Sequence, residues 1–153
     1  MILGLIADTH GYLDPRIPEL FAGVHHILHA GDFGGQQIID QLNVIAPVTA
    51  VLGNNDFEPG FRATEVVELQ GCRCFIHHIV DRPYPAASLL ERIARSQADV
   101  VVFGHTHKKY LDRDDGRLWV NPGYSGKPRP STLRSVALLE LSPEGPIVKF
   151  LPL

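Results

Sequence analysis

The stretch MILGLIADTHG (residues 1–11) sets a pattern that recurs along the chain: a short apolar run that stops abruptly at polar residues. Such a run is typical of a buried strand that leads into a loop. Two further runs, at residues 24–30 and 48–52, end in the same way, and helix-like sequence at 15–22 and 36–42 separates the three. Because strands alternate with helices, this first part of the chain predicts a parallel sheet covered by helices.

The rest of the chain changes to a rhythm of hairpins. Strand-like runs flank three short turns that contain glycine, namely Gln70-Gly71, Asp114-Asp115-Gly116 and Pro143-Glu144-Gly145. Turns of this composition join neighbouring antiparallel strands. A helix-like stretch at 86–96 and a very apolar run at 99–103 lie between the first two turns. The whole pattern predicts an α/β fold, and the length of 153 residues predicts one domain over 1–153.

Composition narrows the functional classes. Apolar residues make up 44% and charged residues 20%, which is the balance of a folded globular chain. With 14 Lys and Arg against 17 Asp and Glu, the net charge of -3 argues against a general nucleic-acid binder. No apolar run reaches the ~18 residues that cross a bilayer, and the first residues lack the basic leader of a signal peptide. We therefore expect a cytoplasmic protein without a membrane partner.

Four polar clusters directly follow apolar, strand-like runs. In open α/β sheets ligands bind at the carboxyl ends of the strands, so these clusters can meet at one edge. Residues two apart in an extended segment point the same way, so each Asp-x-His or His-x-His pair can grip one site. The clusters are Asp8-Thr9-His10, Gly31-Asp32, Gly53-Asn54-Asn55-Asp56 and Gly104-His105-Thr106-His107.

The residue types in these clusters point to a metal. Asp oxygens, His nitrogens and an Asn oxygen without a nearby thiolate suit Mn, Fe, Co, Ni or Zn, and they disfavour a closed structural zinc site. The clusters offer more ligands than one ion needs, which favours two ions with Asp32 as the shared carboxylate. Taken singly, an Asp or His after a strand is more often a turn, cap or packing residue, so the hypothesis rests on the ordered combination.

In that order, the Asp-x-His, Gly-Asp, Gly-Asn-x-Asp and Gly-His-x-His motifs resemble the calcineurin-like metallophosphoesterases. The short length and the Asn121-Pro122-Gly123 segment are most similar to the small bacterial and archaeal phosphodiesterases of that superfamily. The resemblance covers essentially the whole chain. It implies a four-layer α-β-β-α sandwich of two mixed sheets, with two divalent metal ions at one edge and hydrolysis of a phosphoester.

The resemblance also implies a set of metal ligands. The family usually has His-Gly-His at the strand end where this chain reads His77-His78-Ile79. We expect His77 as the ligand with His78 in the place of the glycine, although a shift of one residue would swap the two. The implied ligands are Asp8, His10 and His107 for the first ion, Asn54, His77 and His105 for the second, and Asp32 for both.

Three further residues are candidates for catalysis. Many relatives carry His where this chain has Asn55, and Asn can donate a hydrogen bond but cannot supply a proton near neutral pH. We expect Asp56 to orient its neighbours. Arg129 follows Asn121-Pro122-Gly123 and suits contact with a phosphate, against the alternative of a solvated loop charge. Of the other histidines, His25, His26 and His29 are interpreted as structural.

The resulting hypothesis is hydrolysis of a phosphodiester, with a monoester as the second option, by water that two metal ions activate ~3.5–4 Å apart. Mn is the first choice of metal, the partner is a small phosphoester substrate, and an oligomer stays open. The alternative from another class is a non-catalytic metal-binding scaffold of the same fold that acts in protein interaction. Asn55 and the altered 77–79 segment keep that alternative in consideration.

Overall fold

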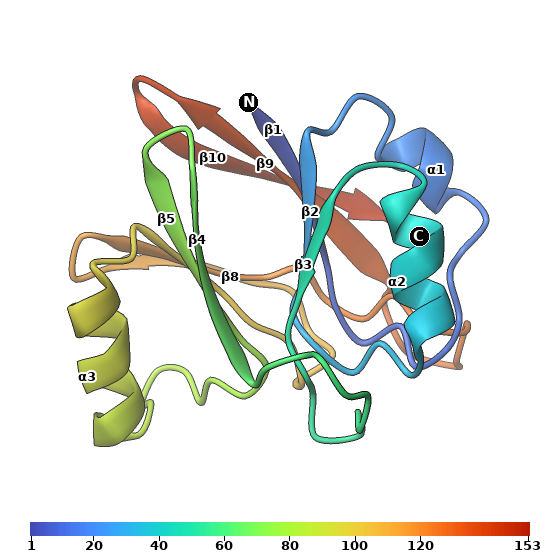
Figure 1. Ribbon diagram of the computed structural model, residues 1–153, viewed down its shortest axis with the longest axis horizontal. Coiled ribbons are helices and arrows are strands. Elements are labelled where there is room, and N and C mark those ends of the chain that lie inside the picture. The colour runs from blue at the N-terminus through green and yellow to red at the C-terminus, as the bar shows by residue number, and fades with distance from the viewer.

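The computed structural model describes all 153 residues and contains two five-stranded sheets packed face to face (Figure 1). The first sheet has the order β10-β9-β1-β2-β3. Its parallel part consists of β1 (Ile2–Ile6), β2 (His26–His29) and β3 (Val48–Ala50), and its antiparallel part of β9 (Ser135–Ser142) and β10 (Gly145–Pro152). Two helices, α1 (Ile17–Leu20) and α2 (Gln36–Asn43), cover its outer face.

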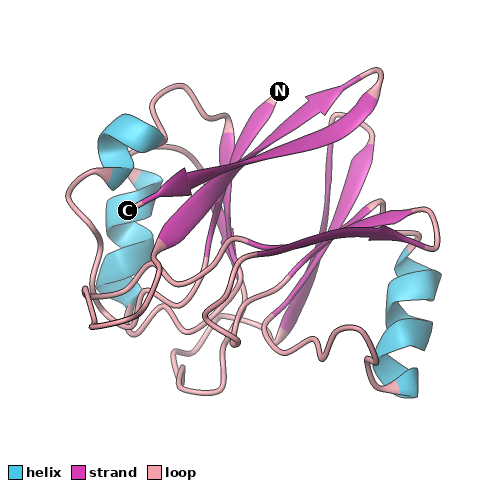
Figure 2. Ribbon diagram, turned by 180° about the vertical axis from the view of Figure 1, so that it is seen from behind, coloured by secondary structure: helices cyan, strands magenta, loops and turns pink.

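The second sheet has the order β4-β5-β6-β8-β7. The central strands β5 (Cys72–His77), β6 (Val100–Val102) and β8 (Arg117–Asn121) are parallel, whereas β4 (Thr64–Leu69) and β7 (Tyr110–Asp114) pair antiparallel at the edges. Helix α3 (Ala87–Ser96) packs on the outer face of this sheet, on the opposite side of the molecule from α1 and α2 (Figure 2). The four-layer sandwich of two mixed sheets is therefore confirmed.

Strand alternation divides the apolar residues among three cores. In β1, Leu3 and Leu5 face the second sheet and join the central core, whereas Ile6 packs among the residues of α1 and α2. In β6, Val100 and Val102 join the same central core, and Val101 faces α3. Each such fully buried side chain contributes about 1.5–3 kcal/mol to stability. The alternation fixes which face of each strand is outward and so where the next loop begins.

The expected elements are all present, with shifts at their ends. The three hairpin turns lie where the glycine-containing turns predict them. Helix α1 is shorter than the expected stretch of 15–22, and β3 ends at Ala50 rather than residue 52. None of the three helices combines the length and apolar character that a membrane crossing requires.

The parallel strands bring their carboxyl ends to one edge of the sandwich, where long loops gather (Figure 2). The loops after β1 and β2 are joined by backbone hydrogen bonds from Asp8 to Gly31 (3.0 Å) and from His10 to Asp32 (2.9 Å). The loop after β6 is tied to the end of β5, because the Gly104 N–H donates to His78 at 3.0 Å. We call this edge, formed by residues 8–11, 31–34, 53–56, 77–78 and 104–107, the loop edge.

Candidate metal centre

One group of facing ligand atoms at the loop edge consists of Asp8, His10 and His107. His107 Nε2 lies 3.5 Å from Asp8 Oδ1, and His10 Nε2 lies 3.9 Å from the same oxygen. The two imidazole Nε2 atoms are 3.3 Å apart. A carboxylate oxygen and two ring nitrogens that point at one another form a donor set suited to a divalent transition metal.

A second group shares Asp8 and adds Asp32 and His78. His78 Nε2 lies 3.4 Å from Asp32 Oδ2 and 3.9 Å from Asp8 Oδ1. Asn54 Oδ1 is 3.1 Å from His78 Nε2 and 3.1 Å from His105 Nδ1. His10 Nε2 is 3.9 Å from Asp32 Oδ2, so the two groups lie side by side.

The tautomer of His78 follows from its hydrogen bonds. Its Nδ1 lies 2.7 Å from the carbonyl oxygen of Ala30, which can only accept, so Nδ1 carries the proton. The lone pair of the neutral ring is therefore on Nε2 and points toward Asp32 Oδ2 and Asn54 Oδ1. Three atoms that all bear lone pairs face one another, and a cation between them would relieve their repulsion.

Asp8 provides a direct test of whether these residues fit a cation. Its carboxylate is fully buried, and Oδ2 accepts the backbone N–H of His105 at 3.1 Å. Its other oxygen, Oδ1, is buried without any hydrogen-bond partner. A buried acceptor without a partner destabilises the fold unless something else satisfies it. Because both groups of ligand atoms converge on Oδ1, these residues fit a pair of divalent ions.

The expectation that His77 belongs to this site is corrected by its position. The His77 ring lies away from both groups, and its Nδ1 contacts Thr64 Oγ1 at 2.8 Å and the carbonyl oxygen of Ala63 at 2.9 Å. His78 occupies the place expected for His77. The two neighbours face opposite ways, as successive residues at a strand end do.

The backbone at the loop edge adopts an unusual conformation. The φ angles are positive at five of the expected ligands: Asp8 (55°), His10 (47°), Asp32 (55°), His105 (69°) and His107 (58°). The left-handed region costs an L-residue of order 1–2 kcal/mol, and such strain clusters at functional sites. Each Asp-x-His or His-x-His pair therefore converges through a tight left-handed loop. The extended geometry assumed from the sequence is wrong, although its outcome, convergence, is what the structure shows.

One glycine makes the convergence possible. A Cβ on Gly53 would overlap both Oδ1 and the backbone nitrogen of Asp32. Only a residue without a side chain lets the loop after β3 pass so close to the loop after β2.

Asn55 donates two hydrogen bonds to the carboxylate of Asp32. Its backbone N–H donates to Asp32 Oδ1 at 2.9 Å, and its Nδ2 donates to Asp32 Oδ2 at 2.8 Å. Burial favours the neutral form of Asp32, but these bonds, together with nearby His78 and His10, outweigh it and lower the pKa of the carboxyl. Asp32 is thus held ionised with one lone pair of each oxygen free, as a shared metal ligand requires.

Asp56 acts on the loops and contacts no candidate ligand atom. Its buried carboxylate accepts the backbone N–H groups of Phe33 (3.1 Å), Gly34 (2.9 Å) and Gly53 (2.9 Å). These bonds fasten the loop after β2 to the loop after β3. They hold the loop that carries Asp32 against the loop that carries Asn54.

His29 and Thr9 form a second support beneath the site. His29 Nδ1 accepts the N–H of Gly31 at 3.2 Å, so Nε2 carries the proton and donates it to Thr9 Oγ1 at 2.9 Å. The Thr9 hydroxyl then donates to the carbonyl of Phe33 at 3.1 Å. Burial lowers the pKa of His29 to about 3, so this chain of bonds is kept neutral.

Arg129 does not contact the candidate ligands directly. Its guanidinium stacks on the ring of Tyr124, 4.8 Å from the centroid, and that ring lies 4.8 Å from the ring of His107. Tyr124 is fully buried, and the sequence does not predict its place beside His107. Its signal in the sequence is faint, because an aromatic residue after Asn121-Pro122-Gly123 looks like ordinary core packing.

Comparison with known proteins agrees with this geometry. The domain model described as the calcineurin-like phosphoesterase superfamily matches residues 1–144, and the chain belongs to that superfamily. A probable metallophosphoesterase of Methanocaldococcus jannaschii is 32% identical over 149 residues, which cover 92% of this chain and 76% of the relative. A protein of the same archaeon named a phosphodiesterase is 31% identical over 147 residues, or 80% of this chain and 83% of that protein.

A solved structure shares the fold over nearly its whole length. Wild-type Vps29 of Entamoeba histolytica, crystallised in complex with Zn²⁺, superposes with a TM-score of 0.75 at 22% identity, covering 99% of both chains. At this identity the likeness shows the architecture alone.

Proposed function

We propose that this protein hydrolyses phosphodiesters, with monoesters as a second substrate class, using two divalent metal ions of which Mn²⁺ is the first choice. The observation that carries the proposal is the buried Oδ1 of Asp8, which has no hydrogen-bond partner and faces two groups of ligand atoms. The proposed ligands are Asp8, His10 and His107 for one ion, Asn54, His78 and His105 for the other, and Asp32 between them.

When bound, two divalent ions lower the pKa of water toward neutrality and neutralise charge on the phosphoryl oxygens. The chain's own residues hold the ligands in place for that chemistry. Ala30 fixes the His78 ring through Nδ1, and Asn55 keeps Asp32 ionised. Two hydroxyls lie beside the proposed ligands in the sequence, and both are engaged: Thr9 with Phe33 and His29, and Thr106 with Asn121 and the backbone N–H of Lys108. We therefore expect no covalent phosphoryl-enzyme.

Asn55 determines where the leaving group obtains its proton. Its amide donates to Asp32 and cannot release a proton near neutral pH, so the leaving oxygen takes its proton from solvent. Esters of acidic alcohols such as p-nitrophenol should react much faster than esters of ordinary alcohols. The substitution Asn55→His should reduce this dependence on the leaving-group pKa; an unchanged dependence would refute this role of Asn55.

The test of the proposed function combines metal analysis with an activity screen. Protein purified after Mn²⁺ loading should carry about two ions per chain and cleave bis(p-nitrophenyl) phosphate, and chelation should abolish the cleavage. A screen of monoesters and diesters then ranks the two substrate classes. Trapping of a phosphorylated side chain would contradict the scheme.

The second candidate function is a metal-binding scaffold for another protein. Two observations favour it: Asn55 stands where a proton donor is usual in the family, and the fold matches Vps29, named for vacuolar protein sorting. Two bound ions without cleavage of any phosphoester in the screen would support the scaffold and refute the enzyme.

A further inference from the structure

A pocket of about 540 Å³ opens directly beside the candidate metal centre, and His107 belongs to both. Three segments that are distant in sequence form its walls: the loop after β6, the segment that enters β9, and the end of β10. The residues that line it are Thr106, His107, Lys108, Lys109, Ser131, Thr132, Leu133, Arg134, Ser135, Phe150 and Pro152.

The charge of this pocket is opposite in sign to that of the whole protein. The chain has a net charge of -3, yet no Asp or Glu lines the pocket, whereas Lys108 and Lys109 do. Arg134 does not add to the free charge, because its Nη2 donates to Asp14 at 2.8 Å in a buried ion pair. Positive charge without a partner attracts anions from solution.

The two lysines are free to take up a ligand. The ion pairs of the protein are made by arginine and histidine, so neither ammonium group is engaged with a carboxylate. Lys109 Nζ lies 5.7 Å from the centroid of the Phe150 ring. An ammonium beside an aromatic face gives the pocket an apolar surface next to a cation.

The remaining lining suits an organic group. Ser131 and Thr132 offer hydroxyls, and Phe150 and Leu133 offer apolar surface. A ligand that fills such a pocket combines carbon surface with polar atoms and at least one negative charge. Because His107 lines the pocket and is also a candidate metal ligand, a substrate bound at the metals can extend into it.

We infer that this pocket binds the organic arm of the phosphoester and that Lys108 and Lys109 contact a second anionic group, carboxylate or phosphate, on that arm. The inference rests on the proposed function and specifies its substrate class: phosphodiesters with an additional negative charge away from the scissile phosphate. Such a substrate is held at both ends, which fixes its orientation over the metals.

The test measures binding, so it does not depend on turnover. Mn²⁺-loaded protein is titrated calorimetrically with ω-carboxyalkylphosphonates of two to five methylene groups, each matched with an alkylphosphonate of equal length. At one chain length the carboxylate should tighten binding about tenfold, which corresponds to ~1.4 kcal/mol. A parallel series with a terminal phosphonate ranks the two kinds of anion.

The double variant Lys108→Ala/Lys109→Ala should lose this tenfold gain while its Mn²⁺ content and its affinity for the plain alkylphosphonates stay within about twofold. Lys149→Ala is the matched control, because Lys149 lies on β10 outside the pocket and its loss should leave the gain intact. Equal affinity for both members of every pair would overturn the inference. So would a gain that survives in the double variant, since the carboxylate would then be binding the metals. Protein that takes up no Mn²⁺ would refute the proposed function instead.

Discussion

The two ends of the β-sandwich both contain residues with positive φ, but for different reasons. At the end where the hairpins turn, the left-handed residues are Gln70-Gly71 between β4 and β5 and Asp115-Gly116 between β7 and β8. Two consecutive positive φ angles are what a two-residue hairpin turn requires, and the following glycine favours it. At the loop edge Gly11, Gly31 and Gly34 are left-handed, and so are five Asp and His residues. His10 lies in a turn that the Tyr12 N–H closes on the Thr9 carbonyl at 3.0 Å, whereas Asp8, Asp32 and His107 have no such turn.

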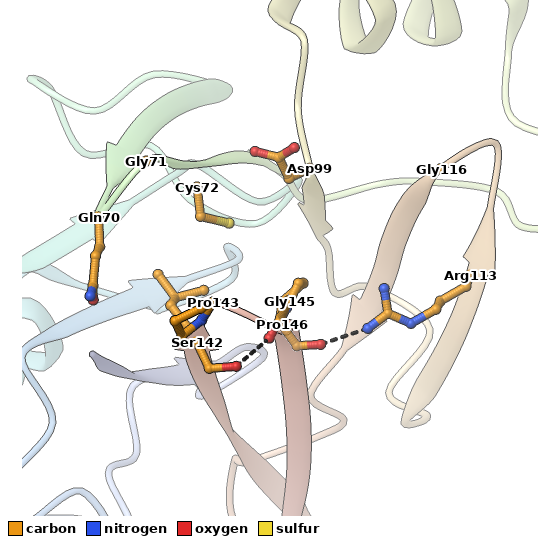
Figure 3. Close-up of a pocket in the computed structure, with 11 residues that line it drawn as sticks. Gln70, Gly71, Cys72, Asp99, Arg113, Gly116, Ser142, Pro143, Gly145 and Pro146 are labelled. Carbon is orange, nitrogen blue, oxygen red and sulfur yellow. Dashed lines mark hydrogen bonds between the residues drawn. The ribbon is translucent and has the colours of Figure 1, made fainter.

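The charged groups at the two ends also differ in whether they have hydrogen-bond partners. The hollow at the hairpin end, of about 370 Å³, contains Asp99 and Arg113 (Figure 3). Arg113 Nη2 donates to the carbonyl of Pro146 (Figure 3). Asp99 Oδ2 accepts the N–H of Arg73 at 2.8 Å, so both charges serve the fold. At the loop edge Asp8 Oδ1 has no partner. The other buried side-chain atom without a partner is Arg117 Nε at the hairpin end, but its guanidinium still pairs with Asp115 through Nη1. A left-handed backbone and a carboxylate oxygen without a partner occur together at the loop edge, so stability alone does not explain the geometry of that end.

The substitution Asp8→Asn should have the largest effect and should separate activity from stability. Loss of this proposed ligand should lower phosphodiesterase activity at least about 10³-fold, since a catalytic metal supplies several kcal/mol. The free energy of unfolding of the metal-free variant should nevertheless be about 1 kcal/mol higher than that of the metal-free wild type, because a buried unpaired charge is removed. The variant should therefore unfold at a higher urea concentration. Activity assays and urea unfolding of the metal-free proteins measure the two effects.

The control for Asp8 is Asp115→Asn at the hairpin end. Asp115 is exposed and contacts Arg117 at 2.6 Å, and Asn also tolerates a positive φ. Activity and stability should both stay near wild type, within about 0.5 kcal/mol for stability. A metal-free Asp8→Asn protein that is less stable than wild type would show that the carboxylate serves the fold.

Asp14→Asn should cost stability and have a defined pH dependence. The Asp14 carboxylate is held by hydrogen bonds from Arg16 and from the buried Arg134, and these outweigh burial and lower its pKa well below the usual range. A lowered folded pKa contributes stability above the unfolded pKa of ~3.9 that is lost as pH falls through the folded value. The variant should therefore lose about 3 kcal/mol at pH 7, with the difference shrinking below about pH 4.

Urea unfolding of both proteins at pH 7, 4 and 3 measures this difference. The exposed pair of Asp115 and Arg117 provides the contrast, because breaking it should cost less than about 1 kcal/mol at any pH. A difference for Asp14→Asn that grows toward low pH would contradict the assigned direction of the pKa shift.

His78→Ala and His77→Ala should differ by about 10²-fold in activity, although the residues are neighbours. His78 Nε2 faces Asp32 and Asn54, so its loss should remove one proposed ion along with activity. His77 contacts Thr64 and Ala63 instead, and its loss should leave activity within about threefold and metal content unchanged. Metal analysis and kinetics of the two variants decide which histidine is the ligand. A greater loss of metal and activity in His77→Ala than in His78→Ala would assign the ligand role to His77.

Gly53→Ala and Gly71→Ala compare a glycine from each end. At the loop edge a Cβ on Gly53 would overlap Asp32, so we expect about 2 kcal/mol of destabilisation and at least tenfold lower activity. At the hairpin end Gly71 has a φ of 75° and open space around it, so its variant should lose about 1 kcal/mol with unchanged activity. Thermal unfolding and activity assays measure both. Equal activity losses would remove the distinction between the two ends.

The sequence predicts the hairpin end better than the loop edge, because hairpins depend on local residues. Glycine-containing turns between strand-like runs predict all three hairpins, and each turn lies at its expected place. The loop edge is indicated by where the polar clusters fall, but its conformation depends on contacts such as Asp8 with Gly31 and Asn55 with Asp32. Those contacts join residues more than twenty positions apart, and no local pattern encodes them.

The choice between His77 and His78 shows the same limit. Cys74 and Ile76 face the central core and Phe75 faces α3, so a count by two places His78 on the face between the sheets. In the sequence Arg73 and His77 mark the outer face of β5, but Phe75 between them is apolar and packs under α3, so the alternation that would give the parity is interrupted. The place of Tyr124 is missed for a related reason: in the sequence, an aromatic residue that packs beside a metal ligand cannot be told from one that packs in an apolar core.

The measurement that tests the central claim most directly is anomalous diffraction from crystals grown with Mn²⁺. The account predicts two peaks at the loop edge, ~3.5–4 Å apart, one among Asp8, His10 and His107 and the other among Asn54, His78 and His105, with Asp32 between them. Crystals that show no peak at the loop edge, or peaks bound only to surface carboxylates elsewhere, would contradict it.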